Sequence, residues 1–298
     1  MHLLKRILTA VLLIPVVLLL VLRAPVPVLA LVAALVALLT VQELLKLAEA
    51  YSIRPFHWPT YIFVGLFFLF LAVNPGRATP LLSTAMFAGS LGFLAAMAAF
   101  VFLVIGMGRD DLSTAFPAAM TSAFAFAYVA LPLGFLVQIR EHWAGGFLLL
   151  YLLLLVWAGD IFAYFVGRSL GRHLMSPRIS PRKTWEGALA SMVASLAVGV
   201  LLYKYALPIS TALLNAHLIE RKDGMFALDK AALWPTLALS AAINVAAQLG
   251  DLVESLIKRG AGVKDSGKLL PGHGGMLDRV DALLFVSAWT YVYVVQLR

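Results

Sequence analysis

The stretch ILTAVLLIPVVLLLVL, which runs from Ile7 to Leu22, contains no charged side chain. Apolar runs of about this length are typical of membrane-spanning helices, and similar runs recur along the whole chain. Of the 298 residues, 62% are hydrophobic and 13% are charged, whereas a soluble domain carries about 25% charged residues. One soluble core cannot bury so much apolar surface, so the sequence predicts a polytopic membrane protein.

This first run follows Lys5 and Arg6, as the apolar core of a signal peptide would. No small-residue cleavage site follows it, so we expect it to be retained as the first span. The predicted fold is an all-α transmembrane helical bundle, a single integral membrane domain over 1–298 in which 1–150 carry no motif and 151–298 are catalytic. The about nine predicted spans are 7–22, 28–45, 59–73, 83–107, 115–137, 143–165, 187–205, 231–250 and 280–297.

Basic residues concentrate in cytoplasmic loops of membrane proteins. A cytoplasmic N-terminus places the two most basic loops, 168–183 and 258–279, together on the cytoplasmic side. The net charge of +8 then indicates attraction to anionic lipid headgroups, not to nucleic acid. The absence of cysteine excludes disulfides, thiolate metal sites and cysteine nucleophiles.

Charge is concentrated in two segments, 157–187 and 248–281, which hold nearly half of the Asp, Glu, Lys and Arg residues in about a fifth of the chain. Charge at membrane depth is costly and usually marks function. A transporter would instead place charges in mid-span on broken helices within repeated halves, and a scaffold would have no use for them. We therefore expect chemistry in these two segments.

In the second segment, Asp251 and Ser255 lie one helical turn apart, and Lys258 and Arg259 follow on the same face. An acid and a hydroxyl suit a hard cation, and the basic pair suits phosphate oxygens. Glycines let backbone N–H groups approach a polyanion closely. Those of this loop are Gly260, Gly262, Gly267, Gly272, Gly274 and Gly275.

Asp278 and Asp281 lie one turn apart where the chain re-enters the membrane, so Asp278 is able to return to the cation of Asp251. The alternative is that Asp251 and Asp278 are helix-end charges neutralised by Arg259 and Arg279. Both interpretations place these acids at the membrane surface.

The first segment has a similar spacing, because Arg168 follows Asp160 by eight residues as Arg259 follows Asp251. Its loop is a candidate site for an anionic headgroup or a triphosphate. A positive-inside anchor, with Asp160 simply paired to Arg168, is the alternative. The polar residues that follow Arg168 in this segment are Arg172, Arg178, Ser180, Arg182, Lys183, Thr184 and Glu186.

Three stretches near the C-terminus follow one another at short spacings: Ser255-Leu-Ile-Lys-Arg259, Lys264-Asp265-Ser-Gly267 and Pro271-Gly-His-Gly-Gly275-Met-Leu-Asp278-Arg279-Val-Asp281. Together they resemble the signature of the phosphatidate cytidylyltransferases (CDP-diacylglycerol synthases), and every fixed position is met. Upstream, 160–168 and 180–187 resemble the second conserved stretch of that family. Ile161 departs from it, since many members have a small hydroxylated residue there.

The resemblance implies a multi-pass enzyme of phospholipid biosynthesis that converts CTP and phosphatidic acid to CDP-diacylglycerol and pyrophosphate. It implies Mg²⁺ dependence, a paired-metal site at Asp251 and Asp278 with a second cation, and a homodimer in contact with membrane lipids. We expect the cytoplasmic membrane of a bacterium, with the site facing the cytoplasm. The same chemistry on another lipid phosphate, or a cation-coupled transporter, is the alternative.

The expected site residues fall into two groups. Catalytic roles in metal binding, charge stabilisation or loop bracing are assigned to Asp251, Lys258, Arg259, Lys264, Asp265, His273, Asp278 and Arg279. Substrate binding is assigned to Asp160, Arg168, Ser180, Lys183, Ser255, Gly274, Gly275 and Asp281.

Overall fold

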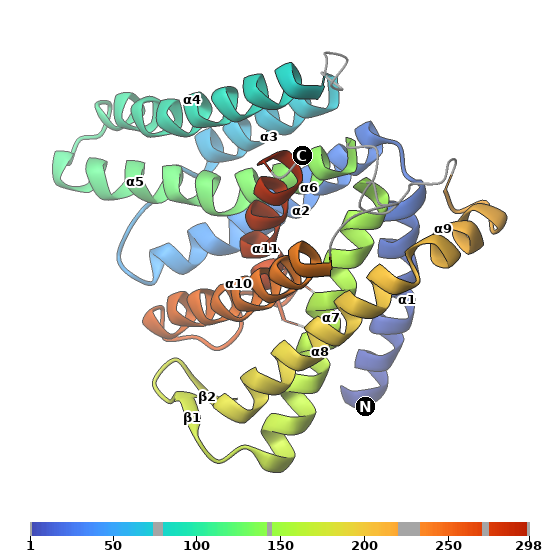
Figure 1. Ribbon diagram of the computed structural model, residues 1–298. Coiled ribbons are helices and arrows are strands. Elements are labelled where there is room, and N and C mark those ends of the chain that lie inside the picture. The colour runs from blue at the N-terminus through green and yellow to red at the C-terminus, as the bar shows by residue number, and fades with distance from the viewer. Residues whose placement is uncertain (1, 74–79, 142–144, 220–232, 270–273, 297–298) are drawn as a thin grey trace. The chain divides into compact units, whose positions relative to one another are not determined.

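The computed structural model describes residues 2–73, 80–141, 145–219, 233–269 and 274–296 (Figure 1). The chain divides into two compact units and passes between them several times. Unit 1 comprises 1–6, 25–137 and 257–280, and unit 2 comprises 7–24, 138–256 and 281–298.

Unit 1 is formed mainly by the N-terminal helices, in which α2 packs against α3 and α4 packs against α5 (Figure 1). A π-helical segment, η2, interrupts the long helix that continues from α5 into α6. The elements are α2 (Val26–Glu49), α3 (His57–Val73), α4 (Pro80–Gly106), η1 (Leu112–Thr114), α5 (Ala115–Ala125), η2 (Phe126–Ala130) and the start of α6 (Leu131–Glu141).

Aromatic packing forms the core of unit 1. The fully buried Phe126 ring meets Phe63 edge-on, with centroids 4.7 Å apart, and Phe67 at 5.4 Å. A Cβ atom at Gly134 of α6 would lie only 2.6 Å from the Phe67 ring. The glycine therefore makes room for the ring, and edge-to-face contacts of this kind stabilise the packing beyond the area they bury.

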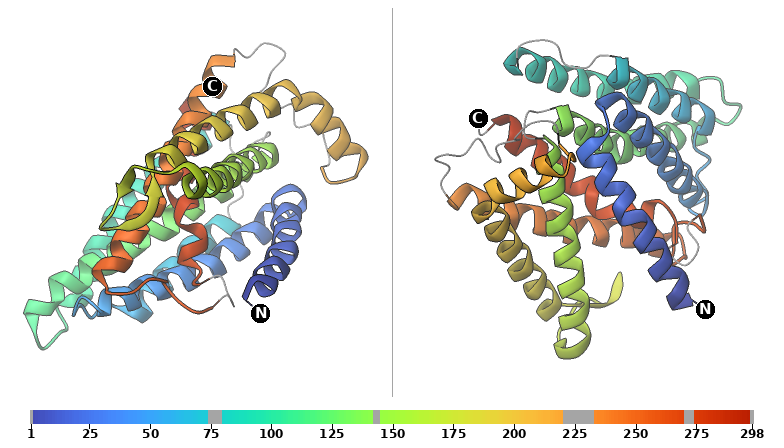
Figure 2. Two further views of the ribbon diagram at one scale, coloured as in Figure 1. Left: turned by 90° about the horizontal axis from the view of Figure 1, so that it is seen from below. Right: turned by 90° about the vertical axis from the view of Figure 1, so that its right-hand side faces the viewer.

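In unit 2, α7 and α8 lie side by side in both views of Figure 2. A two-stranded antiparallel ribbon connects them, and Thr184 caps α8 by accepting a hydrogen bond from the Gly187 N–H at 3.2 Å. The elements are most of α1 (His2–Arg23), then α7 (Gly145–Leu170), β1 (Leu174–Ser176), β2 (Ser180–Thr184), α8 (Trp185–Lys204), α9 (Ala206–Asn215), most of α10 (Leu233–Gly260) and most of α11 (Leu277–Gln296).

A buried polar network joins α8 to α10. Asn244 is 2% exposed and donates to the hydroxyls of Ser191 at 2.8 Å and Ser195 at 2.9 Å. Gln248, one turn further along α10, donates to the Asn244 carbonyl oxygen at 2.6 Å. A Cβ atom at Gly159 of α7 would lie within 3 Å of the Ser191 and Asn244 side chains. Small and amide side chains of this kind bring membrane helices together.

The prediction of an almost entirely helical chain is confirmed, and each of the nine predicted segments corresponds to a helix where it is described. Within the predicted basic loop 168–183, β1 and β2 pair as a short ribbon. Among the described residues, five helices are long and apolar enough to cross a membrane: Val26–Glu49, Leu112–Glu141, Gly145–Leu170, Trp185–Lys204 and Leu233–Gly260. The count of nine spans and the orientation stay predictions.

Candidate active site

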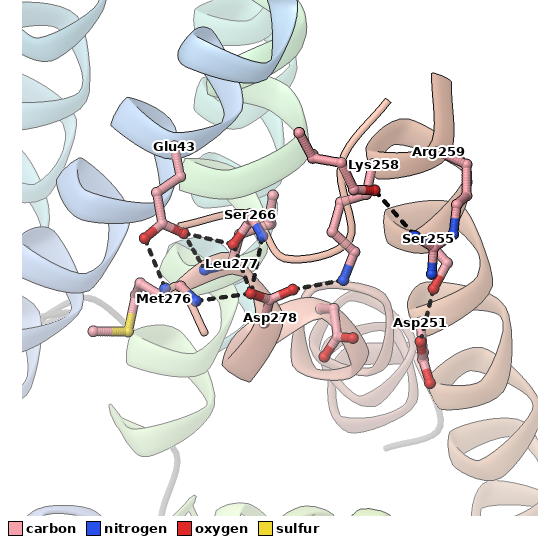
Figure 3. A network of polar contacts seen from close by, with 12 residues as sticks. Glu43, Asp251, Ser255, Lys258, Arg259, Ser266, Met276, Leu277 and Asp278 are labelled. Carbon is pink, nitrogen blue, oxygen red and sulfur yellow. Dashed lines mark hydrogen bonds and ion pairs between the residues drawn. The ribbon is translucent and has the colours of Figure 1, made fainter. Parts of the chain in front are cut away.

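In unit 1, Asp278 lies in the first turn of α11 and receives donors from the C-terminal signature. Its Oδ1 accepts from the Lys258 ammonium at 2.5 Å, and both side chains are about nine-tenths buried (7% and 11% exposed). Its Oδ2 accepts from the Ser266 N–H and hydroxyl, both at 3.0 Å, and from the Gly275 N–H at 2.7 Å (Figure 3). An acid here also interacts favourably with the helix dipole.

Two glycines of the signature are explained by this geometry. Gly274 has φ = +80°, a conformation that side chains of L-residues rarely adopt, and a Cβ atom there would also collide with the Asp278 carboxylate. A Cβ atom at Gly275 would collide with the Ser266 hydroxyl and the Glu43 carboxylate. The Gly275 N–H, predicted to meet a substrate anion, donates to the Asp278 carboxylate of the protein itself in this structure.

Glu43 of α2 is a buried acid in the same unit, and it lies outside the motifs of the sequence. It is 8% exposed and accepts hydrogen bonds from Ser266, Met276 and Leu277 (Figure 3). The available signal was an acid inside an otherwise apolar predicted span, since a charge in such a place usually has a function.

In unit 2, Asp251 on α10 gathers with two other acids. One carboxylate oxygen each from Asp251, Glu254 and Asp281 lie within 4.8 Å of one another. Glu254 is completely buried, whereas the Asp251 side chain is 41% exposed. A Cβ atom at Gly250 would lie 2.7 Å from the Asp281 carbonyl oxygen and 3.3 Å from the Ala282 Cα. The glycine before Asp251 thus lets the backbone of α11 approach and brings Asp281 to the cluster.

Asp251 also has two donors. The Lys183 ammonium of β2 lies 2.8 Å from Asp251 Oδ2, and the Ser255 hydroxyl donates to Oδ1 at 3.3 Å (Figure 3 shows the second contact). Lys183 and Asp251 line a cavity of about 280 Å³, together with Asp160, Tyr164 and Gln248. The cavity therefore presents both charge signs and lies beside the buried polar network of α8 and α10.

The structure groups the predicted residues by unit. Arg168 donates to the Tyr164 hydroxyl at 2.9 Å, and Arg259 donates to the Val263 carbonyl at 3.1 Å. His273 lies outside the described residues.

Unit 1 contains Lys258, Arg259, Lys264, Asp265, Gly274, Gly275, Asp278 and Arg279, and unit 2 contains Asp160, Arg168, Ser180, Lys183, Asp251, Ser255 and Asp281. The shared ion between Asp251 and Asp278, which belong to different units, stays a prediction.

Comparison with known proteins agrees with the signature. Three relatives carry the name phosphatidate cytidylyltransferase. The relative from Brucella abortus is 40% identical over 145 residues, which are 49% of this chain and 46% of the relative. The relative from Haemophilus influenzae is 37% identical over 179 residues (57% and 56%), and the relative from Thermotoga maritima is 38% identical over 183 residues (61% and 61%). The chain thus spans about half the length of the curated relatives it matches. A sequence model described as the cytidylyltransferase family matches residues 4–297. Because that match covers nearly the whole chain, the protein belongs to the cytidylyltransferase family.

Proposed function

We propose that the protein transfers the cytidylyl group of CTP to phosphatidic acid and releases pyrophosphate, so that CDP-diacylglycerol forms in the membrane. The observation that carries the proposal is the cluster of Asp251, Glu254 and Asp281 beside the Lys183 cavity. Gathered carboxylates favour a cation, and a basic side chain at a cavity favours phosphate. The signature and the names of the relatives supply the substrate class.

In the proposed reaction, an oxygen of the phosphatidate phosphate attacks the α-phosphorus of CTP. The new P–O bond forms as the bond to the bridging oxygen of the β-phosphate breaks, and pyrophosphate leaves with the electron pair. The nucleophile is already an anion, so the protein does not have to supply one. The remaining tasks are to position two polyanions and to offset their repulsion.

Mg²⁺ prefers oxygen ligands, and the donor set of the acidic cluster fits it. We propose Asp251 and Asp278 as ligands, with Glu254 and Asp281 supporting Asp251 and a second cation. When bound, the ion neutralises charge on the phosphate oxygens. Asp278 Oδ1 accepts from Lys258. If that oxygen held the ion, the Lys258 ammonium would have to move and would then be able to contact a phosphate.

We infer the location of the active site from the charge distribution of the sequence. The basic residues of 168–183 and 258–279 favour an active site at the cytoplasmic surface of a bacterial membrane. The acyl tails of phosphatidic acid would stay in the lipid phase and enter between helices. We also propose a homodimer, as the resemblance implies.

The test is direct. Purified protein in lipid–detergent micelles is incubated with CTP, phosphatidic acid and Mg²⁺, and both the lipid product mass and pyrophosphate are measured. CDP-diacylglycerol formed in equal amount to pyrophosphate supports the proposal. If product forms only when an ether-linked isoprenoid phosphate is supplied, that lipid, and not phosphatidic acid, is the substrate. Counterflow of a solute into proteoliposomes without pyrophosphate would favour a transporter and overturn the proposal.

A further inference from the structure

The carboxylate of Glu43 accepts hydrogen bonds from three donors of the C-terminal signature. Its Oε1 accepts from the Met276 N–H at 2.9 Å. Its Oε2 accepts from the Leu277 N–H at 2.9 Å and from the Ser266 hydroxyl at 2.8 Å. Figure 3 shows the side chain reaching from α2 to these groups. A residue of the N-terminal half, which carries no motif, thus holds the segment that carries the signature.

The backbone N–H groups of Met276 and Leu277 explain why an acid stands at position 43. Leu277 begins α11 and Met276 precedes it, so neither N–H has an acceptor within the helix. A carboxylate offers acceptor atoms on both sides, whereas an amide side chain would turn an N–H₂ group toward one of the donors. The negative charge also interacts favourably with the N-terminus of the helix.

Glu43 and Asp278 share a donor. The Ser266 hydroxyl lies 2.8 Å from Glu43 Oε2 and 3.0 Å from Asp278 Oδ2, and the Ser266 N–H donates to Asp278. Since Leu277 directly precedes Asp278, the amide that Glu43 fixes also sets the direction of the Asp278 side chain. Gly267 and Gly275 lie so close that a Cβ atom on either would collide with the Glu43 carboxylate.

We infer that Glu43 is a positioning residue for cytidylyl transfer: it holds Ser266, Met276 and Leu277 so that the Asp278–Lys258 pair faces the reacting phosphates. The inference rests on the proposed function. We assign Glu43 no direct contact with the substrates. Partners that orient such acids typically change affinity or rate about 10- to 100-fold when they are removed.

The experiment compares Glu43→Gln with Glu49→Gln. Glu49 lies at the end of the same helix, but it is half-exposed and pairs with His57 at 2.8 Å. Two quantities are measured: hydrogen–deuterium exchange of the peptide around 274–280 without substrates, and kcat together with the Mg²⁺ concentration that gives half-maximal activity. A smaller fraction of folded enzyme lowers kcat but leaves the Mg²⁺ midpoint unchanged, so the midpoint separates positioning from folding.

We expect Glu43→Gln to speed exchange of the 276 and 277 amides at least tenfold, to lower kcat about 10- to 100-fold and to raise the Mg²⁺ midpoint about tenfold or more. Glu49→Gln should match the parent in all three. An unchanged exchange rate, or a kcat loss with an unchanged midpoint, overturns the inference. If the parent makes no product, the proposed function fails, whereas unchanged exchange in Glu43→Gln would separately overturn the positioning role of Glu43.

Discussion

Two groups of carboxylates in this molecule differ in what surrounds them. In unit 1, Glu43 and Asp278 are enclosed by backbone N–H groups, a hydroxyl and an ammonium. In unit 2, carboxylate oxygens of Asp251, Glu254 and Asp281 lie within 4.8 Å of one another, and Asp251 also pairs with Lys183. Donors around an anion fix its position, whereas like charges at close range favour a cation or a proton. The first group therefore fixes geometry, and the second concentrates negative charge.

The largest expected effect is loss of activity without loss of fold in Asp251→Asn. Asparagine keeps the size of the side chain but removes the charge of Asp251, which is 41% exposed and lines the cavity, so we expect turnover to fall by about 10³-fold. Its thermal unfolding temperature should stay close to that of the parent. Pyrophosphate release and a melting curve in the same detergent measure both.

Asp110→Asn is the matched control, because Asp110 is an exposed loop acid outside both groups. The control should keep full activity. Near-normal turnover in Asp251→Asn would contradict the assignment of Asp251 as a metal ligand. The proposed functional difference between the two groups of carboxylates would then fail as well.

Asp278→Asn should lower both activity and stability. The change leaves the buried Lys258 ammonium facing an amide instead of a carboxylate, and breaking a buried ion pair typically costs about 3–5 kcal/mol. We expect a clear fall in unfolding temperature, and a double variant with Lys258→Met should recover part of it without recovering activity. If Asp278→Asn melts with the parent, Asp278 is not held as the structure indicates.

The sequence predicted the helices well because their apolar runs are long. It selected Lys258 and Asp278 because the signature contains them, and Asp251 because it lies one helical turn before Ser255 on the same face. Glu43 was missed because its partner Ser266 is 223 positions away. Glu254 was missed because its meeting with Asp281 depends on how α11 packs over Gly250. Side-chain meetings of this kind depend on tertiary packing, which a single sequence does not encode locally.

Glu254→Gln tests whether the second group attracts a cation. In the parent, Mg²⁺ that binds only the folded state should raise the free energy of unfolding by about 2.7 kcal/mol at a hundredfold excess over Kd, and the unfolding temperature should rise with it. The buried amide removes one of three like charges, so Glu254→Gln should unfold at a higher temperature than the parent in EDTA and gain less from Mg²⁺. Glu49→Gln serves as the control, and an equal Mg²⁺ gain in all three proteins would contradict a cation site at the cluster.

The smallest expected effect belongs to Ser266→Ala, which removes the hydroxyl between Glu43 and Asp278 but leaves the Ser266 N–H in place. A hydroxyl has one proton, so it serves one of the two carboxylates at a time, and both keep their backbone donors. Loss of one hydrogen bond corresponds to about 1 kcal/mol, or about a fivefold fall in kcat. Steady-state kinetics beside Glu43→Gln should give the smaller loss for Ser266→Ala. A loss as large as that of Glu43→Gln would mean that the hydroxyl, and not the pair of amides at the start of α11, carries the link between the two acids.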